Sequence, residues 1–107
     1  MIDPALYQRT LSWEDAQAFE KARVAFVVSE DPGTAVHSME VVSVTERPAA
    51  AAGHQFSIVF RGPRDPLLPQ GTYRVRHPEL GDFAVFVTPV GRTKDTTDYE
   101  ACFSHVD

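Results

Sequence analysis

Alternation of apolar and polar residues is the dominant pattern of this chain after residue 23. It is clearest where Phe56, Ile58 and Phe60 are separated by single residues of other kinds. A period of two places successive side chains on opposite faces of a β-strand, so one face of each such segment can be buried. Six segments show this alternation or a run of β-branched residues, and we expect them to be strands: 24–29, 37–45, 55–61, 72–76, 83–87 and 99–104.

A segment before the strands has the spacing of a helix instead. Its apolar residues recur every third position and can form one stripe that faces a core. These residues are Trp13, Ala16, Phe19 and Ala22. Ser12 is a suitable N-cap, and Lys21 and Arg23 would place positive charge at the C-terminal end of the helix dipole. The pattern predicts one helix within residues 11–22 that covers one end or one face of a sheet.

The order of these elements predicts the fold class. No second long helical pattern follows the first, which argues against parallel strands, because parallel strands need long crossover connections. Six strands that are apolar on one face must close into a barrel or roll over themselves. We therefore predict a mainly β fold, an antiparallel six-stranded meander forming a small barrel or roll with one short N-terminal helix. The expected organisation is a single domain, 1–107, with an arm over 1–10, the helix over 11–22 and the barrel or roll over 23–104.

Two strands flank a loop rich in Gly and Pro, and we expect them to pair as a hairpin that spans residues 55–76. In the second of these strands, Tyr73 and Val75 alternate with Arg74 and Arg76. The alternation predicts that the tyrosine and valine point inward and that both arginines point outward.

Phe86 is out of register with the apolar residues of its own strand, so it is predicted to lie on the outer face. An exposed aromatic side chain at this position needs cover. Either Trp13 or Phe19 of the helix supplies that cover, which is the favoured interpretation, or a partner chain does.

The net charge of the chain narrows the classes of partner that we expect it to bind. Ten Lys and Arg against fifteen Asp and Glu give a formal net charge of −5. A net negative domain gains little counterion-release affinity for nucleic acid and is not attracted to anionic membranes, so we expect neither partner. Four arginines nevertheless fall between positions 61 and 76, namely Arg61, Arg64, Arg74 and Arg76. They form either a local anion site or, as we favour, solvent-facing positions balanced by Asp65, Glu79 and Asp82.

Candidate chemistry is sparse. The four histidines occur singly, without the short spacing of a metal site, so neither a metal nor another cofactor is expected. The single cysteine, Cys102, alternates on a predicted strand and is expected to be a buried or half-buried, inert thiol. No apolar run approaches the roughly 20 residues that span a bilayer, and the N-terminus lacks a signal-peptide pattern, so the expected location is cytoplasmic.

The second half of the chain carries a series of motifs that resembles a known family. The motifs are FRGP at 60–63, LLPQGTYR at 67–74, HPELG at 77–81, FVTPVG at 86–91 and YEACF at 99–103. They are similar to those of a family of small bacterial proteins with a domain of unknown function. The resemblance implies no activity, cofactor or catalytic residue. It implies an accessory or assembly role, through an association with genes for phage-tail-collar-like proteins.

These observations favour a non-enzymatic accessory or protein-interaction module. The loop over 62–71 and the outward arginines are the expected contact with an unidentified protein partner or a second copy. Within that loop, adjacent leucines either tuck into the end of the barrel, as we favour, or form an apolar contact. The candidate contact residues are Arg61, Arg64, Leu67, Leu68, Gln70, Arg74, Arg76 and Phe86.

Two alternatives remain open. One is a small-ligand or enzymatic site at a barrel mouth, formed by His77, Glu79 and Tyr99. A deep pocket that contains these three side chains would favour it. The other is a self-associating structural subunit that pairs through an edge strand near Val24 or Tyr99.

Overall fold

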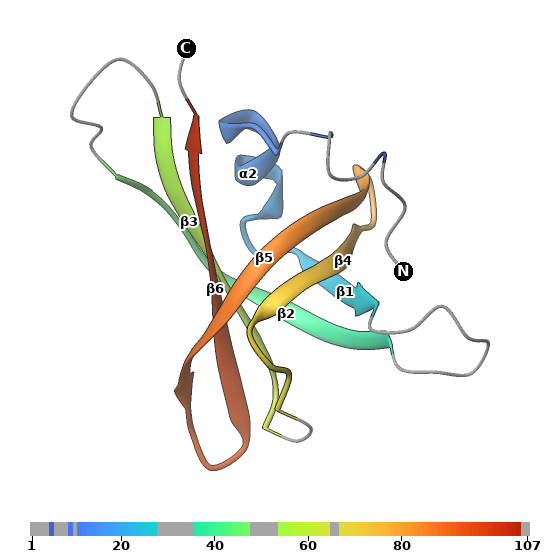
Figure 1. The fold of residues 1–107 in the computed structure, drawn as a ribbon, viewed down its shortest axis with the longest axis vertical. Helices are drawn as coiled ribbons and strands as arrows, with labels where there is room; N and C mark the ends of the chain where they lie inside the picture. Colours follow the sequence, from blue (N-terminus) through green and yellow to red (C-terminus); the bar gives the residue numbers. More distant parts are fainter. Residues whose placement is uncertain are drawn as a thin grey trace.

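Six strands and one short helix make up the computed structural model, which describes Ala5, Arg9 and residues 11–27, 36–47, 54–64 and 67–105 (Figure 1). The helix is α2, Trp13–Phe19. The strands are β1 Arg23–Val27, β2 Val36–Arg47, β3 His54–Pro63, β4 Gly71–His77, β5 Gly81–Arg92 and β6 Thr96–His105. The alternating segments of the sequence are therefore strands, and all of their pairings are antiparallel.

The strands close into a barrel in the order β1-β2-β3-β6-β5-β4, with β4 paired back to β1. The predicted mainly β fold, an antiparallel six-stranded barrel with one short helix, is confirmed. The order is not that of a continuous meander, because β3 pairs with β2 and β6 while β4 pairs with β1 and β5. The hairpin expected over residues 55–76 is accordingly wrong. A long connection rich in proline does not force its flanking strands together as a two-residue turn does.

Aromatic rings fill the interior of the barrel. Phe26 on β1 lies 5.1 Å from Phe60 on β3 and 6.1 Å from Tyr99 on β6, measured between ring centroids. Tyr73 on β4 stacks on Phe26, with 5.9 Å between the ring centroids. Side chains from four strands thus meet in one core, as the period of two predicts.

One end of the barrel is splayed, and the helix occupies it. The pairing of β5 with β6 stops at Thr88 and Glu100, although both strands continue beyond these residues. Figure 1 shows the two strands diverging there, with α2 between them. Phe19 of the helix is fully buried among rings of β3 and β5, and Trp13 packs on Phe56 at 5.4 Å. The helix therefore completes the core where β5 and β6 diverge.

The helix is shorter than predicted at both ends. Ser12 is its N-cap and forms a capping box with Asp15, in which each backbone N–H donates to the other side chain at 3.2 and 3.1 Å. Its last residue is Phe19, and Lys21 two residues later has a left-handed φ of 63°. Lys21 and Arg23 lie beyond the helix, so the predicted basic last turn is wrong.

Gly62 lies where the core leaves no room for a side chain. A Cβ at this position would collide with Sδ of Met39 and lie 2.8 Å from its Cε, and Met39 is only 1% exposed. We expect Gly62→Ala to lower the free energy of unfolding by about 1–3 kcal/mol, because the thioether must move within a close-packed core. Chemical denaturation followed by circular dichroism measures this change.

Gly71→Ala is the matched control for this substitution, since a Cβ at Gly71 meets nothing within 4 Å. It should change the free energy of unfolding by no more than about 0.5 kcal/mol. Combining Gly62→Ala with Met39→Val, which shortens the colliding side chain, should cost less than the two single changes added together. Strict additivity would contradict the predicted collision.

Candidate interaction site

The outward side of β4 and β5 is one continuous surface, which we call the β4–β5 face. Alternate residues of the two strands point into the core, and those between them point outward. Three cross-strand pairs form its centre and upper part: Thr72 with Phe86, Arg74 with Ala84, and Arg76 with Asp82. At its lower end, the Thr88 hydroxyl lies 3.4 Å from the Gln70 side-chain oxygen, to which it donates.

Three arginines converge on Asp82 at the upper end of this face. Arg74 Nε lies 2.6 Å from one carboxylate oxygen, and Arg76 binds both oxygens, through Nε at 2.9 Å and Nη2 at 3.3 Å. Arg9, in the chain before the helix, donates to the backbone carbonyl of Asp82 at 3.0 Å. Its guanidinium also lies 3.9 Å from the centre of the Phe83 ring. Asp82 is thus the acid that balances the outward arginines of β4.

These contacts shift two ionisation equilibria. Hydrogen bonds from Arg76 first and then from Arg74, together with their positive charges, hold the pKa of Asp82 below its usual range against the opposing effect of burial. The hydrogen bond to Asp82 raises the pKa of the Arg76 guanidinium above its already high value. The cluster therefore stays charged at neutral pH.

Asp82 should make the stability of the protein depend on acid pH. Because its folded pKa lies below its unfolded value of about 3.8, its contribution is present above pH 4 and is lost as the pH falls through the folded pKa. Asp82→Asn should cost about 1 kcal/mol at pH 7, a magnitude reduced by the exposure of Arg76. This loss of unfolding free energy in Asp82→Asn should decrease towards pH 2, because Asp82 of the wild type becomes protonated there. Urea unfolding across this range checks it, and parallel pH profiles for variant and wild type would contradict it.

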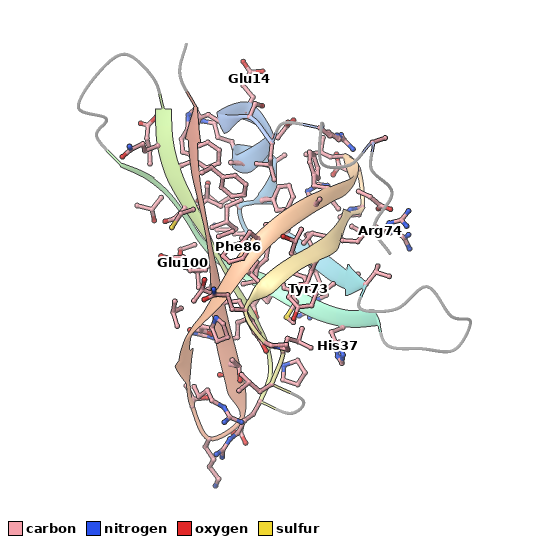
Figure 2. The ribbon with its side chains drawn as sticks, viewed as in Figure 1. Glu14, His37, Tyr73, Arg74, Phe86 and Glu100 are labelled. Carbon is pink, nitrogen blue, oxygen red and sulfur yellow. The ribbon has the colours of Figure 1, made fainter. Side chains whose placement is uncertain are left out.

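Phe86 is 54% exposed at the centre of the β4–β5 face. The favoured interpretation, that Trp13 or Phe19 covers it, is wrong, because the helix lies on the inner side of β5 and its rings pack on core residues. Figure 2 shows Phe86 over β5, away from the helix end marked by Glu14. A large aromatic side chain is thus left uncovered by the described residues.

The loop before β4 divides its two leucines between core and surface. Leu68 is 7% exposed, and its N–H donates to the Tyr99 hydroxyl at 3.0 Å. The residue after Leu68 is Pro69, and its carbonyl accepts a hydrogen bond from the Tyr73 hydroxyl at 2.5 Å. Leu67 remains 45% exposed. The expected burial is correct for Leu68 alone, which belongs to the hydrophobic core.

The remaining predicted arginines lie elsewhere. Arg61 on β3 forms a bidentate pair with Asp98 on β6, at 2.8 and 3.1 Å, and β6 and β5 separate it from β4. This contact raises the pKa of Arg61. The Arg64 carbonyl accepts from Arg92 and from the Thr97 hydroxyl, at the end of the β5–β6 hairpin. The structure therefore gathers Gln70, Arg74, Arg76 and Phe86 on one face and leaves Arg61 and Arg64 outside it.

One contact of this surface has no signal in the local sequence. Arg9 reaches Asp82 across a separation of 73 residues, which no local pattern reports. Val90 is 54% exposed at an irregularity of the β5–β6 pairing between Pro89 and Gly91, where a proline within a strand pattern does indicate a bulge.

The three residues of the alternative mouth site do not converge. His77, 3% exposed, accepts at Nδ1 from the backbone N–H groups of Glu79 and Leu80 at 3.0 and 3.1 Å, so Nε2 carries the proton and donates to the Ala18 carbonyl at 3.1 Å. The Tyr99 hydroxyl accepts from the N–H of Leu68, which precedes the first residue of β4. His77 is the last residue of β4, so the length of the strand, about 20 Å, separates the two sites. His77 thus holds the helix to the β4–β5 turn.

Across the described ranges, no three His, Cys, Asp or Glu side chains lie together as a metal site. Cys102 is exposed, so its expected burial is wrong. No helix among these residues is long and apolar enough to cross a membrane.

A comparison with protein families identifies the family of this chain. The model of a domain of unknown function, DUF6916, matches residues 11–103. The match covers most of the chain, so the chain belongs to this family, and the expected resemblance to a family with a domain of unknown function is confirmed. Neither a curated protein nor a solved structure matched.

Proposed function

We propose that this member of the DUF6916 family is a non-enzymatic interaction module that contacts a protein partner through the β4–β5 face. The observation that carries the proposal is Phe86, 54% exposed in the middle of a sheet surface. Arg74 and Arg76 lie on the neighbouring strand. Aromatic and arginine side chains are enriched among residues that dominate the energetics of protein interfaces.

The surroundings of Phe86 suit such a contact. Its cross-strand neighbour is Thr72, and Ala84 lies two residues away on the same side of β5, so no long side chain stands between the ring and the arginines. The face belongs to a closed barrel with a filled core, so a partner meets a surface that is already ordered. The family resemblance implies an association with genes for phage-tail-collar-like proteins, and on that ground we propose a component of such an assembly as the partner.

A ligand or enzymatic site at a barrel mouth has less support. Rings of Phe26, Phe60 and Tyr99 occupy the interior, and both ring nitrogens of His77 are engaged by backbone groups. Leu68 is buried in the same core, and its N–H donates to the Tyr99 hydroxyl. The exposed surface therefore offers better candidates for function than the interior.

Photo-crosslinking in the native host tests the proposal. A benzophenone amino acid in place of Phe86 should capture a specific protein, whereas the same group in place of Glu14, exposed on the helix, should not. Phe86→Ser should abolish co-purification of the captured protein while it changes the free energy of unfolding by no more than about 0.5 kcal/mol. Leu67→Ser, at the exposed leucine of the loop before β4, tests whether this loop also contributes to binding of the captured protein.

Three results would overturn this assignment. Equal capture from both positions would show that the contact is not specific to the face. Retention of the partner by folded Phe86→Ser would place the contact elsewhere. A crosslinked dimer of the chain itself would replace the proposed partner with self-association.

A further inference from the structure

We infer that α2 is a hinged lid, which opens from the splayed end of the barrel about Lys21 while the six strands remain paired. This motion goes beyond the proposed function, because it involves the chain before β1 and not the β4–β5 face. Three features carry it: the way the helix is attached, the backbone conformation at Lys21, and the aromatic surface that the helix covers.

The helix is joined to the barrel by side chains, whereas the strands are joined by backbone ladders. Each strand pairs with two others, and the barrel closes from β4 back to β1 without the helix. The helix contributes the buried side chains of Ala16 and Phe19 and the contact of Trp13 with Phe56. A segment with few contacts and no ladder opens at a lower free energy than core strands do. The helix can therefore leave without breaking a strand pairing.

Two side-chain hydrogen bonds fasten this part of the chain to β4 and β5. His77 Nε2 donates to the Ala18 carbonyl at 3.1 Å, and Arg9 donates to the Asp82 carbonyl at 3.0 Å. A single hydrogen bond of this kind adds only modestly to stability, because water replaces it when it breaks. The bond from Arg9 is exposed, so water reaches it even when the lid is closed. These two bonds hold the lid less firmly than a ladder would.

Lys21 lies at the boundary between the detachable and the anchored parts of the chain. The next residue, Ala22, is anchored, because its carbonyl accepts from the Val41 N–H of β2 at 2.9 Å. Lys21 has a left-handed φ of 63°. Helices usually end with a glycine in this conformation, and a residue with a Cβ adopts it at a cost in free energy. The closed lid therefore holds backbone strain, which is released when Lys21 is free to rotate.

The lid covers aromatic surface inside the splayed end of the barrel. The Phe19 ring lies 6.4 Å from the Phe60 ring and 5.9 Å from the Phe83 ring, measured between centroids. Phe60 and Phe83 are 0% and 1% exposed while the helix is docked. β5 and β6 are not paired with each other beyond Thr88 and Glu100, so these strands need not separate when the helix leaves. Opening would thus expose these rings and leave the barrel closed.

Amide hydrogen exchange of the full chain, measured by NMR at several urea concentrations, tests the lid. A helix of seven residues does not persist alone, so its amides exchange whenever it leaves the barrel. The Ala16 and Ala22 amides, which donate to the Ser12 and Phe19 carbonyls, should exchange at least about tenfold faster than protected amides of β3 and β6. Their exchange should also depend less on urea, because opening the lid exposes less surface than global unfolding does.

Glycine substitutions on either side of the helix end test the hinge. Lys21→Gly should slow exchange of the helix amides about threefold, which corresponds to about 0.7 kcal/mol, because glycine adopts a positive φ without strain. Glu20→Gly is the matched control, since Glu20 has a φ of −57° and holds no such strain. Glycine there only increases the freedom of the open chain, so it should speed exchange by a similar factor.

Two results would overturn the lid. Exchange of the helix amides at the rate and urea dependence of the β3 amides would show that the helix leaves only when the whole barrel unfolds. Faster exchange in Lys21→Gly, equal to that in Glu20→Gly, would show that Lys21 holds no strain for opening to release. Neither result bears on crosslinking at Phe86, so the lid and the interaction module stand or fall separately.

Discussion

Phe19→Ala is expected to lower the free energy of unfolding by about 3–5 kcal/mol, the largest loss among the substitutions considered. Phe19 is fully buried at the splayed end of the barrel. Its ring centroid lies 6.4 Å from Phe60, 5.9 Å from Phe83 and 4.7 Å from the His77 ring. Removal of the ring leaves a cavity shared by three strands, and a short helix cannot move far enough to fill it.

Guanidinium unfolding followed by circular dichroism and by tryptophan fluorescence measures this loss. Trp13 is the single tryptophan and packs on Phe56, so its emission reports whether the helix remains docked. Gln17→Ala, at an exposed position of the same helix, is the control and should cost no more than about 0.5 kcal/mol. A loss below about 1 kcal/mol in Phe19→Ala would show that the helix does not complete the core.

His77→Ala should cost about 2–4 kcal/mol, the second largest effect. The imidazole accepts two backbone N–H groups at Nδ1 and donates from Nε2 to the carbonyl of Ala18. Its removal leaves these buried or half-buried groups without their partners and opens a gap beside Phe19. The same unfolding experiments measure the loss, and Glu79→Ala in the same turn is the control at an exposed position.

His77→Asn distinguishes the two contributions of this side chain. The Asn side-chain oxygen can accept from the backbone N–H two residues ahead, as in an Asx-turn, but it cannot reach the helix or fill the space of the ring. This variant should therefore recover part of the loss in His77→Ala. Full recovery would show that the link from His77 to Ala18 contributes nothing, and no recovery would show that the turn hydrogen bonds contribute nothing.

Local sequence was a reliable guide wherever the deciding interaction is itself local. The period of two predicts the inward set of β3, Phe56, Ile58 and Phe60, because each side chain direction follows from its neighbours along the strand. The capping residue Ser12 is a local signal for the same reason, since its partner Asp15 is three residues away. A left-handed residue at Lys21 has no comparable signal, which is why the predicted helix is too long.

In the candidate site, too, local sequence predicts some features and only the tertiary structure decides others. That Arg74, Arg76 and Phe86 point outward could be read from alternation alone. That nothing among the described residues covers Phe86 depends on the side of β5 on which the helix docks. The convergence of Arg9 on Asp82 depends on the path of the chain before the helix.

By itself, the sequence determined the strands, their inward faces, the cap of the helix and the overall acidity of the protein. Only the tertiary structure decided that β3 pairs with β6 and β4 with β1, that His77 joins helix to turn, and that Arg74 and Arg76 share the carboxylate of Asp82. The physical reason is that alternation specifies which side of a strand is apolar but carries no information about its neighbour. The neighbour is chosen by the packing of residues far apart in the chain, such as Leu68 beneath Tyr99.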